Sequence, residues 1–201
     1  MYRLGAVVSG GGTNLQAVLD AVEDGRISNG RMELVISTNS HAYALERARA
    51  HKVETLVLSK TMYRDNSDRE RDLLDALKTR EIDLLVLCGS FMVFSADFIE
   101  SFGKPIINIH PSLLPDFGGK GFYGLAVHEA VLEAGREVTG ATVHYVDGGI
   151  DTGEIILQKE IAVHKDDTPE TLQTRVMEEG EWKILPEAIA ILLKDFERFG
   201  R

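Results

Sequence analysis

The chain has 201 residues, of which 44% are hydrophobic and 27% are charged, and its formal net charge is −10. This length suits one domain with a substantial core. The longest apolar runs are too short to span a bilayer and residues 1–8 do not look like a signal peptide, so we expect a cytoplasmic protein without a membrane segment. The negative charge argues against nucleic-acid binding, and the lone Cys88 excludes an internal disulfide.

Apolar runs rich in Val, Ile and Leu alternate with stretches of helical periodicity. The runs predict buried parallel strands at residues 4–8, 34–37, 54–58, 84–88 and 106–109. Two sets of apolar residues have the spacing of one helix face: Leu15, Val18, Leu19 and Val22, and then Leu73, Leu74 and Leu77. This alternation predicts an α/β fold with a mostly parallel, Rossmann-like twisted sheet, helices on both faces, and ligands at the carboxyl ends of the strands.

The pattern changes after residue 110. The prolines and glycines within residues 111–124 disfavour a regular helix or strand, which predicts a long loop of the kind that often covers a site. A helix is expected at residues 125–134, followed by strands at residues 140–146 and 154–163. Thr168 and Pro169 are a typical helix start, and the last helical region should extend to about Leu193, with Pro186 dividing it.

Residues 9–14, Ser-Gly-Gly-Gly-Thr-Asn, join the first strand to the first helix. Glycines let the backbone approach an anion, and the free N–H groups of a helix start can donate to it, which predicts a phosphate cradle of Gly11, Gly12, Thr13 and Asn14. The segment lacks the Lys of a P-loop, and Leu15 replaces the last glycine of the dinucleotide motif. A tight turn in which Thr13 or Asn14 merely caps the helix remains the alternative.

Asn108 and His110 alternate with Ile109, so their side chains should lie on the same side of an extended chain. An amide, an imidazolium and a carboxylate such as Asp151 can together stabilise an oxyanion and move protons. Alternatively, His110 is a structural histidine and Asn108 bonds only to loop backbone. We expect no metal site, because the histidines do not have the spacing of metal-ligand motifs; they are His110, His128 and His144.

Three segments resemble the family of folate-dependent glycinamide ribonucleotide formyltransferases of purine biosynthesis: residues 9–17, 108–115 and 140–153. The resemblance covers nearly the whole chain. It implies a single three-layer formyltransferase domain over residues 1–201, with ribonucleotide binding in about residues 1–105 and catalysis and folate binding in about residues 106–201. It also implies formyl transfer from 10-formyltetrahydrofolate to the amine of glycinamide ribonucleotide by a metal-free monomer or homodimer.

The resemblance assigns site residues by position. The catalytic positions are Asn108, His110 and Asp151, where Asn108 and protonated His110 would stabilise the oxyanion and Asp151 would orient His110 and help move a proton. The positions for the ribonucleotide are Gly11, Gly12, Thr13, Asn14, Arg64 and Glu181. The positions for the folate are Met92, Val93, Phe94, Asn108, Val143 and Asp147.

Two features depart from the family pattern. Val93 stands where an arginine commonly follows the methionine, and residues 116–124 are longer than the usual Pro-Gly form. Formyltetrahydrofolate deformylase, which transfers the formyl group to water, is the main alternative function. Methionyl-tRNA formyltransferase should carry an RNA-binding domain for which this chain has no room. A non-catalytic folate- or nucleotide-binding module is the third alternative.

Overall fold

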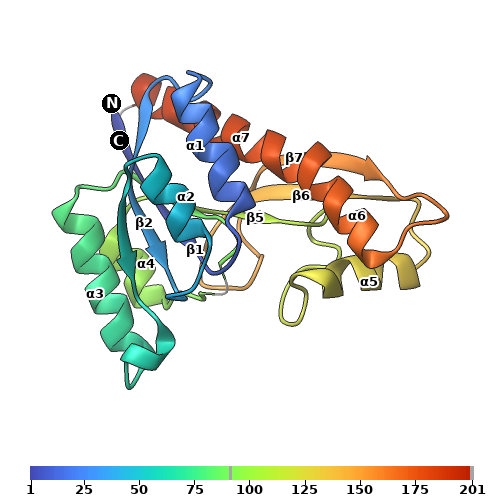
Figure 1. Ribbon diagram of the computed structural model, residues 1–201, viewed down its shortest axis with the longest axis horizontal. Helices are drawn as coiled ribbons and strands as arrows, with labels where there is room; N and C mark the ends of the chain where they lie inside the picture. Colours follow the sequence, from blue (N-terminus) through green and yellow to red (C-terminus); the bar gives the residue numbers. More distant parts are fainter. Residues whose placement is uncertain (91, 200–201) are drawn as a thin grey trace.

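A computed structural model describes residues 1–90 and 92–199 and contains one seven-stranded sheet (Figure 1). The strand order is β3-β2-β1-β4-β5-β6-β7. The first five strands along the chain pair in parallel, whereas β6 and β7 are antiparallel to their neighbours. The strands are β1 (Tyr2–Val8), β2 (Gly30–Ser37), β3 (Glu54–Val57), β4 (Leu84–Leu87), β5 (Ile106–His110), β6 (Val138–Tyr145) and β7 (Ile155–Ala162). The predicted α/β class and mostly parallel sheet are confirmed.

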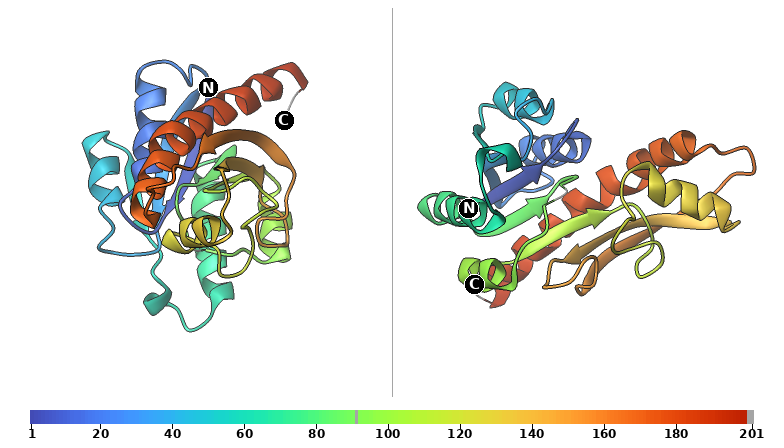
Figure 2. Two further views of the ribbon diagram at one scale, coloured as in Figure 1. Left: turned by 90° about the vertical axis from the view of Figure 1, so that its right-hand side faces the viewer. Right: turned by 90° about the horizontal axis from the view of Figure 1, so that it is seen from below.

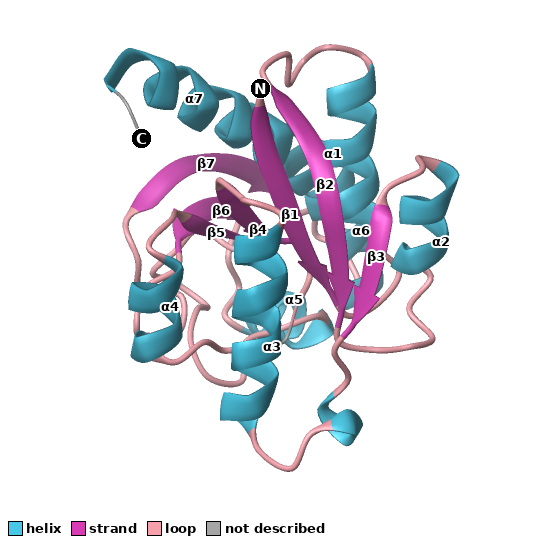
Figure 3. Cartoon of the chain, turned by 90° about the vertical axis from the view of Figure 1, so that its left-hand side faces the viewer, coloured by secondary structure: helices cyan, strands magenta, loops and turns pink. Residues whose placement is uncertain are grey.

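Helices cover both faces of the sheet (Figure 3). The side chains of β1 alternate between two cores: Leu4 and Ala6 pack with α1 and the C-terminal helix, while Val7 packs with α3 and α4. Burial on both faces explains the continuous apolar runs of the central strands. The helices are α1 (Thr13–Glu23), α2 (Ala44–Ala50), α3 (Asn66–Thr79), α4 (Ala96–Phe102), α5 (Leu125–Glu133), α6 (Pro169–Arg175) and α7 (Trp182–Phe199).

The C-terminal helical region differs from its prediction in one respect. It begins as predicted, with Thr168 as the N-cap and Pro169 in the first turn of α6. However, Pro186 lies inside α7 and does not divide it; the division is a π-helical segment, η2 (Val176–Glu181), between α6 and α7. Figure 2 shows this C-terminal helical region in orange to red. Proline disturbs the carbonyl four residues earlier, and here that carbonyl belongs to Trp182, where the hydrogen-bonding pattern already changes.

The strand order reverses between β1 and β4, so the connections leaving these strands diverge. In open α/β sheets, such a point forms a crevice at the carboxyl ends of the strands and commonly binds ligands. The glycine-rich turn follows β1, residues 88–90 continue from β4, and the neighbouring β5 ends at His110. Within the described residues, no helix is long and apolar enough to cross a bilayer.

Candidate active site

A cavity of about 610 Å³ occupies this crevice. Its walls come from the ends of β4 and β5, the loop at residues 119–124, the turn at residues 146–151 and the helical segment η2. The volume falls within the range of about 300–1,000 Å³ that is usual for small-molecule sites. The loop after residue 110 therefore borders the cavity.

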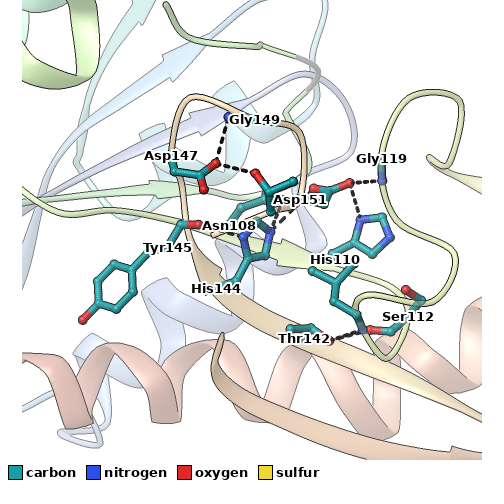
Figure 4. Close-up of polar contacts among 12 residues, drawn as sticks. Asn108, His110, Ser112, Gly119, Thr142, His144, Tyr145, Asp147, Gly149 and Asp151 are labelled. Carbon is teal, nitrogen blue, oxygen red and sulfur yellow. Dashed lines mark hydrogen bonds and ion pairs between the residues drawn. The ribbon is translucent and has the colours of Figure 1, made fainter. Parts of the chain in front are cut away.

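Asn108, His110 and Asp151 all line this cavity, and Figure 4 shows their side chains. Asp151 Oδ2 lies 3.5 Å from His110 Nδ1, and Asp151 Oδ1 lies 3.6 Å from His144 Nε2. His144 stands opposite Asn108 in the antiparallel β5–β6 pair, and its Nε2 is 3.2 Å from Asn108 Nδ2. One carboxylate thus faces two imidazoles, and the second imidazole contacts the Asn108 amide.

Burial decides the resting charge of His110. It lowers the pKa of the imidazole, because removal from water disfavours the charged form; the negative charge of Asp151 opposes this but does not outweigh it. The ring Nε2–H donates to the carbonyl oxygen of Phe117 at 2.8 Å. Burial therefore favours the neutral imidazole in the free protein. The prediction that protonated His110 stabilises the oxyanion concerns the reaction and stays a prediction.

Asp151 is held as a carboxylate at a strained backbone position. Burial raises its pKa, but interactions with His144, His110 and the Gly119 N–H outweigh that effect and lower it overall. The Gly119 N–H donates to Asp151 Oδ2 at 3.0 Å. Asp151 has φ of 57°, in the left-handed region that non-glycine residues seldom adopt. This conformation is part of the turn that brings its side chain over β5 (Figure 4).

Asp147 holds the same turn in shape. Its Oδ1 accepts from the Gly149 N–H at 2.8 Å and from Thr152 Oγ1 at 2.6 Å. These hydrogen bonds lower the pKa of Asp147, so its carboxylate is ionised and remains an acceptor at neutral pH. Asp147 also lines the cavity, next to the turn residue Ile150.

The glycine-rich turn packs against α2 and is hydrogen-bonded to it. Gly12 has φ of 73°, and a Cβ at this position would lie 2.5 Å from the Cβ of Ala44, so only glycine fits. The Ala44 N–H donates to the Gly10 carbonyl at 3.2 Å, and Arg47 Nε donates to the Gly11 carbonyl at 2.8 Å. Sequence reasoning missed Arg47, which no local motif singles out. With these carbonyls held on the α2 side, the N–H groups of the turn remain available to an anion.

Asn14 and Glu181 meet at the cavity wall, although they are far apart in the sequence. Both are buried, and they share a side-chain hydrogen bond. Asn14 Oδ1 has no hydrogen-bond partner, so a donor from a ligand could satisfy it. Burial raises the pKa of Glu181 to about 7.

We expect the Glu181→Gln variant to change the pH dependence of stability. The folded-state pKa of about 7 lies above the ordinary 4.5, so the unfolded carboxyl loses its proton first as pH rises. Stability therefore falls from about pH 4.5 and levels off above about pH 7. Glutamine cannot ionise, so between about pH 5 and pH 8 the free energy of unfolding of the variant should fall by roughly 2–3 kcal/mol less than that of the wild type. Urea unfolding at both pH values measures this, and equal losses would contradict it.

The other predicted site residues lie in different surroundings. Met92, Val93 and Phe94 line the cavity, whereas Val143 is fully buried beneath it, paired with Ile109. Gly11, Gly12 and Thr13 lie in the adjoining turn. Arg64 is exposed and lines neither this cavity nor a second one beside it, so its assignment to the ribonucleotide stays a prediction. Phe91 lies outside the described residues.

The fold and site define an α/β protein with acid–base groups at the carboxyl edge of its sheet. Residues 3–189 match the formyl transferase family model, and the chain belongs to this family. It is 37% identical over 195 residues to the chloroplastic phosphoribosylglycinamide formyltransferase of Arabidopsis thaliana, covering 96% of this chain and 66% of that protein. The chain thus spans slightly less than two thirds of the length of that plant relative.

Solved structures agree with this assignment. The glycinamide ribonucleotide transformylase 1 of Symbiobacterium toebii superimposes with a TM-score of 0.90 at 40% identity, covering 97% of this chain and 89% of that one. The phosphoribosylglycinamide formyltransferase of Bacillus halodurans gives a TM-score of 0.89 at 32% identity, covering 98% of both chains. The predicted formyltransferase fold is thereby confirmed.

Proposed function

We propose that this chain transfers the formyl group of 10-formyltetrahydrofolate to the amine of glycinamide ribonucleotide, a step of purine biosynthesis. The main support is the convergence of Asn108, His110 and Asp151 in one cavity of suitable volume. The similarity of the chain to the two proteins reported above, whose names state this activity, also supports the proposal. The proposal includes small-molecule partners, a cytoplasmic location and no membrane or nucleic-acid partner.

The chemistry follows from these three side chains. Attack of the amine on the formyl carbon creates an oxyanion and a protonated nitrogen. The Asn108 amide would donate to the oxyanion. Negative charge developing beside His110 raises its pKa, so the resting neutral imidazole could take up a proton from solvent, stabilise that charge, and return the proton when the oxyanion collapses. Asp151 would orient His110 and help move the amine proton to the departing folate nitrogen, with no covalent enzyme intermediate.

The substrates are assigned to different walls. The turn at residues 9–14 would hold the ribonucleotide phosphate, and the acceptors Asn14 Oδ1 and Glu181 would take hydroxyl donors of the ribose. The segment Met92 to Phe94 would border the pteridine. By this division, residues 1–105 mainly bind the ribonucleotide, and residues 106–201 carry the catalytic groups and much of the folate site within one domain.

The test is a spectrophotometric assay of 10-formyltetrahydrofolate deformylation by purified protein, with and without glycinamide ribonucleotide. Loss of the formyl group that depends on the ribonucleotide supports the transferase. An equal rate without the ribonucleotide would instead identify a deformylase. No loss of the formyl group under either condition, with both ligands bound, would identify a non-catalytic binding module.

The double variant Thr13→Ala/Asn14→Ala should weaken ribonucleotide binding selectively. It removes the Thr13 hydroxyl from the phosphate turn and the Asn14 amide that would accept from the ribose, and the loss of two such hydrogen bonds typically accounts for a roughly tenfold or larger rise in KM. The KM for the formyl-folate is the internal control and should change little. An unchanged KM for the ribonucleotide in a folded variant would remove this turn from substrate binding.

A further inference from the structure

The α2 helix contributes an arginine to the glycine-rich turn. α2 lies beside α1 (Figure 1), and the Arg47 side chain contacts both the turn and α1. Arg47 Nε donates to the Gly11 carbonyl at 2.8 Å, and Nη1 donates to Gln16 Oε1 at 3.0 Å. The guanidinium carbon also lies over the exposed ring of Tyr43, 5.1 Å from its centroid. These three contacts hold the guanidinium in one place.

The bond to the Gly11 carbonyl determines the direction of the next N–H group. In a trans peptide, the C=O of one residue and the N–H of the next point in opposite directions. The Gly11 carbonyl points toward Arg47, so the Gly12 N–H points away from α2. The Ala44 N–H holds the Gly10 carbonyl in the same way, so the Gly11 N–H also points away from α2. Within the described residues neither N–H has an acceptor, and both can donate to an anion.

Arg47 carries a positive charge without a counter-charge. It forms no ion pair with any carboxylate of the described chain, whereas Arg49 on the same helix pairs with Glu46. Its partners are a backbone carbonyl, an amide oxygen and an aromatic ring, which are all neutral. Gln16 donates in turn to Asp20 Oδ1 at 2.7 Å, so an amide side chain separates that carboxylate from the guanidinium. An unpaired guanidinium beside a helix start makes the local potential positive in a chain whose formal net charge is −10.

The start of α1 has a second feature that points to a ligand. Gly12 is the N-cap residue, and no side chain caps the helix. Asn14 in the first turn is only 8% exposed and lines the candidate active-site cavity, yet its Oδ1 has no hydrogen-bond partner. A ligand with an anionic group at the turn and a hydroxyl donor near Asn14 would satisfy both features. A sugar phosphate has this combination of groups.

We propose that Arg47 is a positioning residue for substrate binding. It fixes the Gly11 peptide so that the turn presents its N–H groups, and its unpaired charge makes the turn selective for a dianionic phosphate monoester. The inference rests on the proposed function and deepens it, because it names the side chain behind the turn to which the ribonucleotide phosphate is assigned. Arg47 acts through the turn and not on the reacting groups, so its substitution should change phosphate binding and leave the chemical step intact.

The experiment compares Arg47→Met with the control Arg49→Met, which removes the same charge from an exposed position of the same helix. Arg47→Met should raise the KM of the ribonucleotide roughly tenfold, the usual effect of losing a charged hydrogen-bonding group. Its kcat and the KM of the formyl-folate should change little. Glycinamide riboside, which lacks the phosphate, should bind weakly to the wild type, and its KM should not respond to the substitution. Arg49→Met should match the wild type throughout.

These readouts separate phosphate recognition from a general loosening of the fold. A merely structural role would raise the KM of the phosphate-free substrate by the same factor, and that outcome overturns the proposal. Arg47→Lys keeps the charge but loses the guanidinium geometry, so it should recover part of the affinity; no recovery in a folded protein contradicts the contribution of charge. If Arg47→Met does not fold, Arg47→Gln, which retains an amide donor and lacks the charge, replaces it with the same readouts.

Calorimetric titration with ribose 5-phosphate makes the test independent of turnover. Wild type and Arg49→Met should bind it with the same Kd, and Arg47→Met should bind it roughly tenfold more weakly. Added salt should weaken binding to the wild type more than to Arg47→Met, because salt screens the charge. Loss of affinity in Arg47→Met supports the inference even if the wild type transfers no formyl group. Normal formyl transfer with an unaltered Kd for ribose 5-phosphate contradicts the inference while leaving the proposed function standing.

Discussion

The His110→Ala variant is expected to lower kcat by about 10²–10³, the usual loss when one group that stabilises an oxyanion is removed. His110 lies at the end of β5 with Asp151 Oδ2 at 3.5 Å from Nδ1, and no other described imidazole occupies this place. The affinity for the ribonucleotide should be largely kept, because the predicted phosphate turn joins β1 to α1 and does not include His110, which ends β5. The measurement is steady-state kcat together with the ribonucleotide Kd.

His41→Ala is the matched control, because His41 is exposed and lines neither cavity. The pH profile supplies a second readout. Burial lowers the pKa of His110, so any inflection of kcat/KM that depends on this imidazole should lie below pH 6.5 in the free protein. Near-normal kcat in folded His110→Ala would remove the imidazole from the mechanism.

The sheet could be predicted because its strands are buried on both faces. Runs such as Leu84–Leu87 are apolar at every position, and such continuity is typical of central parallel strands. The alternation predicted a helix between each pair of successive strands, but no residues could be assigned to α2 and α4, since each has only seven residues and few periodic apolar positions. Their stability depends on tertiary packing, which a local pattern does not reveal.

The candidate site was predictable to the extent that it depends on local geometry. The period-two spacing of Asn108 and His110 predicted that both would lie on the same side of β5, and both line the cavity. The place of His144 opposite Asn108 depends on the register of an antiparallel pair. Arg47 and the Asn14–Glu181 contact depend on the packing of distant helices, for which the sequence offers no spacing rule.

The sequence suggested Asp151 as a candidate carboxylate, but no local spacing rule placed it beside His110. Its side chain reaches His110 because residue 151 adopts φ of 57° in a turn that the hydrogen bonds of Asp147 stabilise. A left-handed residue reverses the local direction of the chain, and a sequence containing several glycines does not specify which residue will do so. This geometry also determines which substitution tests the carboxylate cleanly.

Asp151→Asn is therefore the informative variant, and we expect it to lower kcat by about 10²–10⁴, the range associated with losing a positioned acid–base group. Asparagine tolerates the left-handed region nearly as well as aspartate, and its amide oxygen can still accept from the Gly119 N–H. The turn should thus survive while the negative charge is lost. Alanine at this position would combine the loss of charge with backbone strain.

The loss of charge also predicts a change at His110. The carboxylate is the main group that raises the pKa of this buried imidazole, so in Asp151→Asn that pKa should fall further below 6.5. Imidazole NMR titration of both proteins measures the shift, and Asp75→Asn, an exposed change of equal charge on α3, is the control. A kcat within about threefold of wild type, with the His110 pKa lowered, would show that Asp151 affects the imidazole without contributing to turnover. Loss of kcat without any change in that pKa would instead assign Asp151 a proton-transfer role independent of His110.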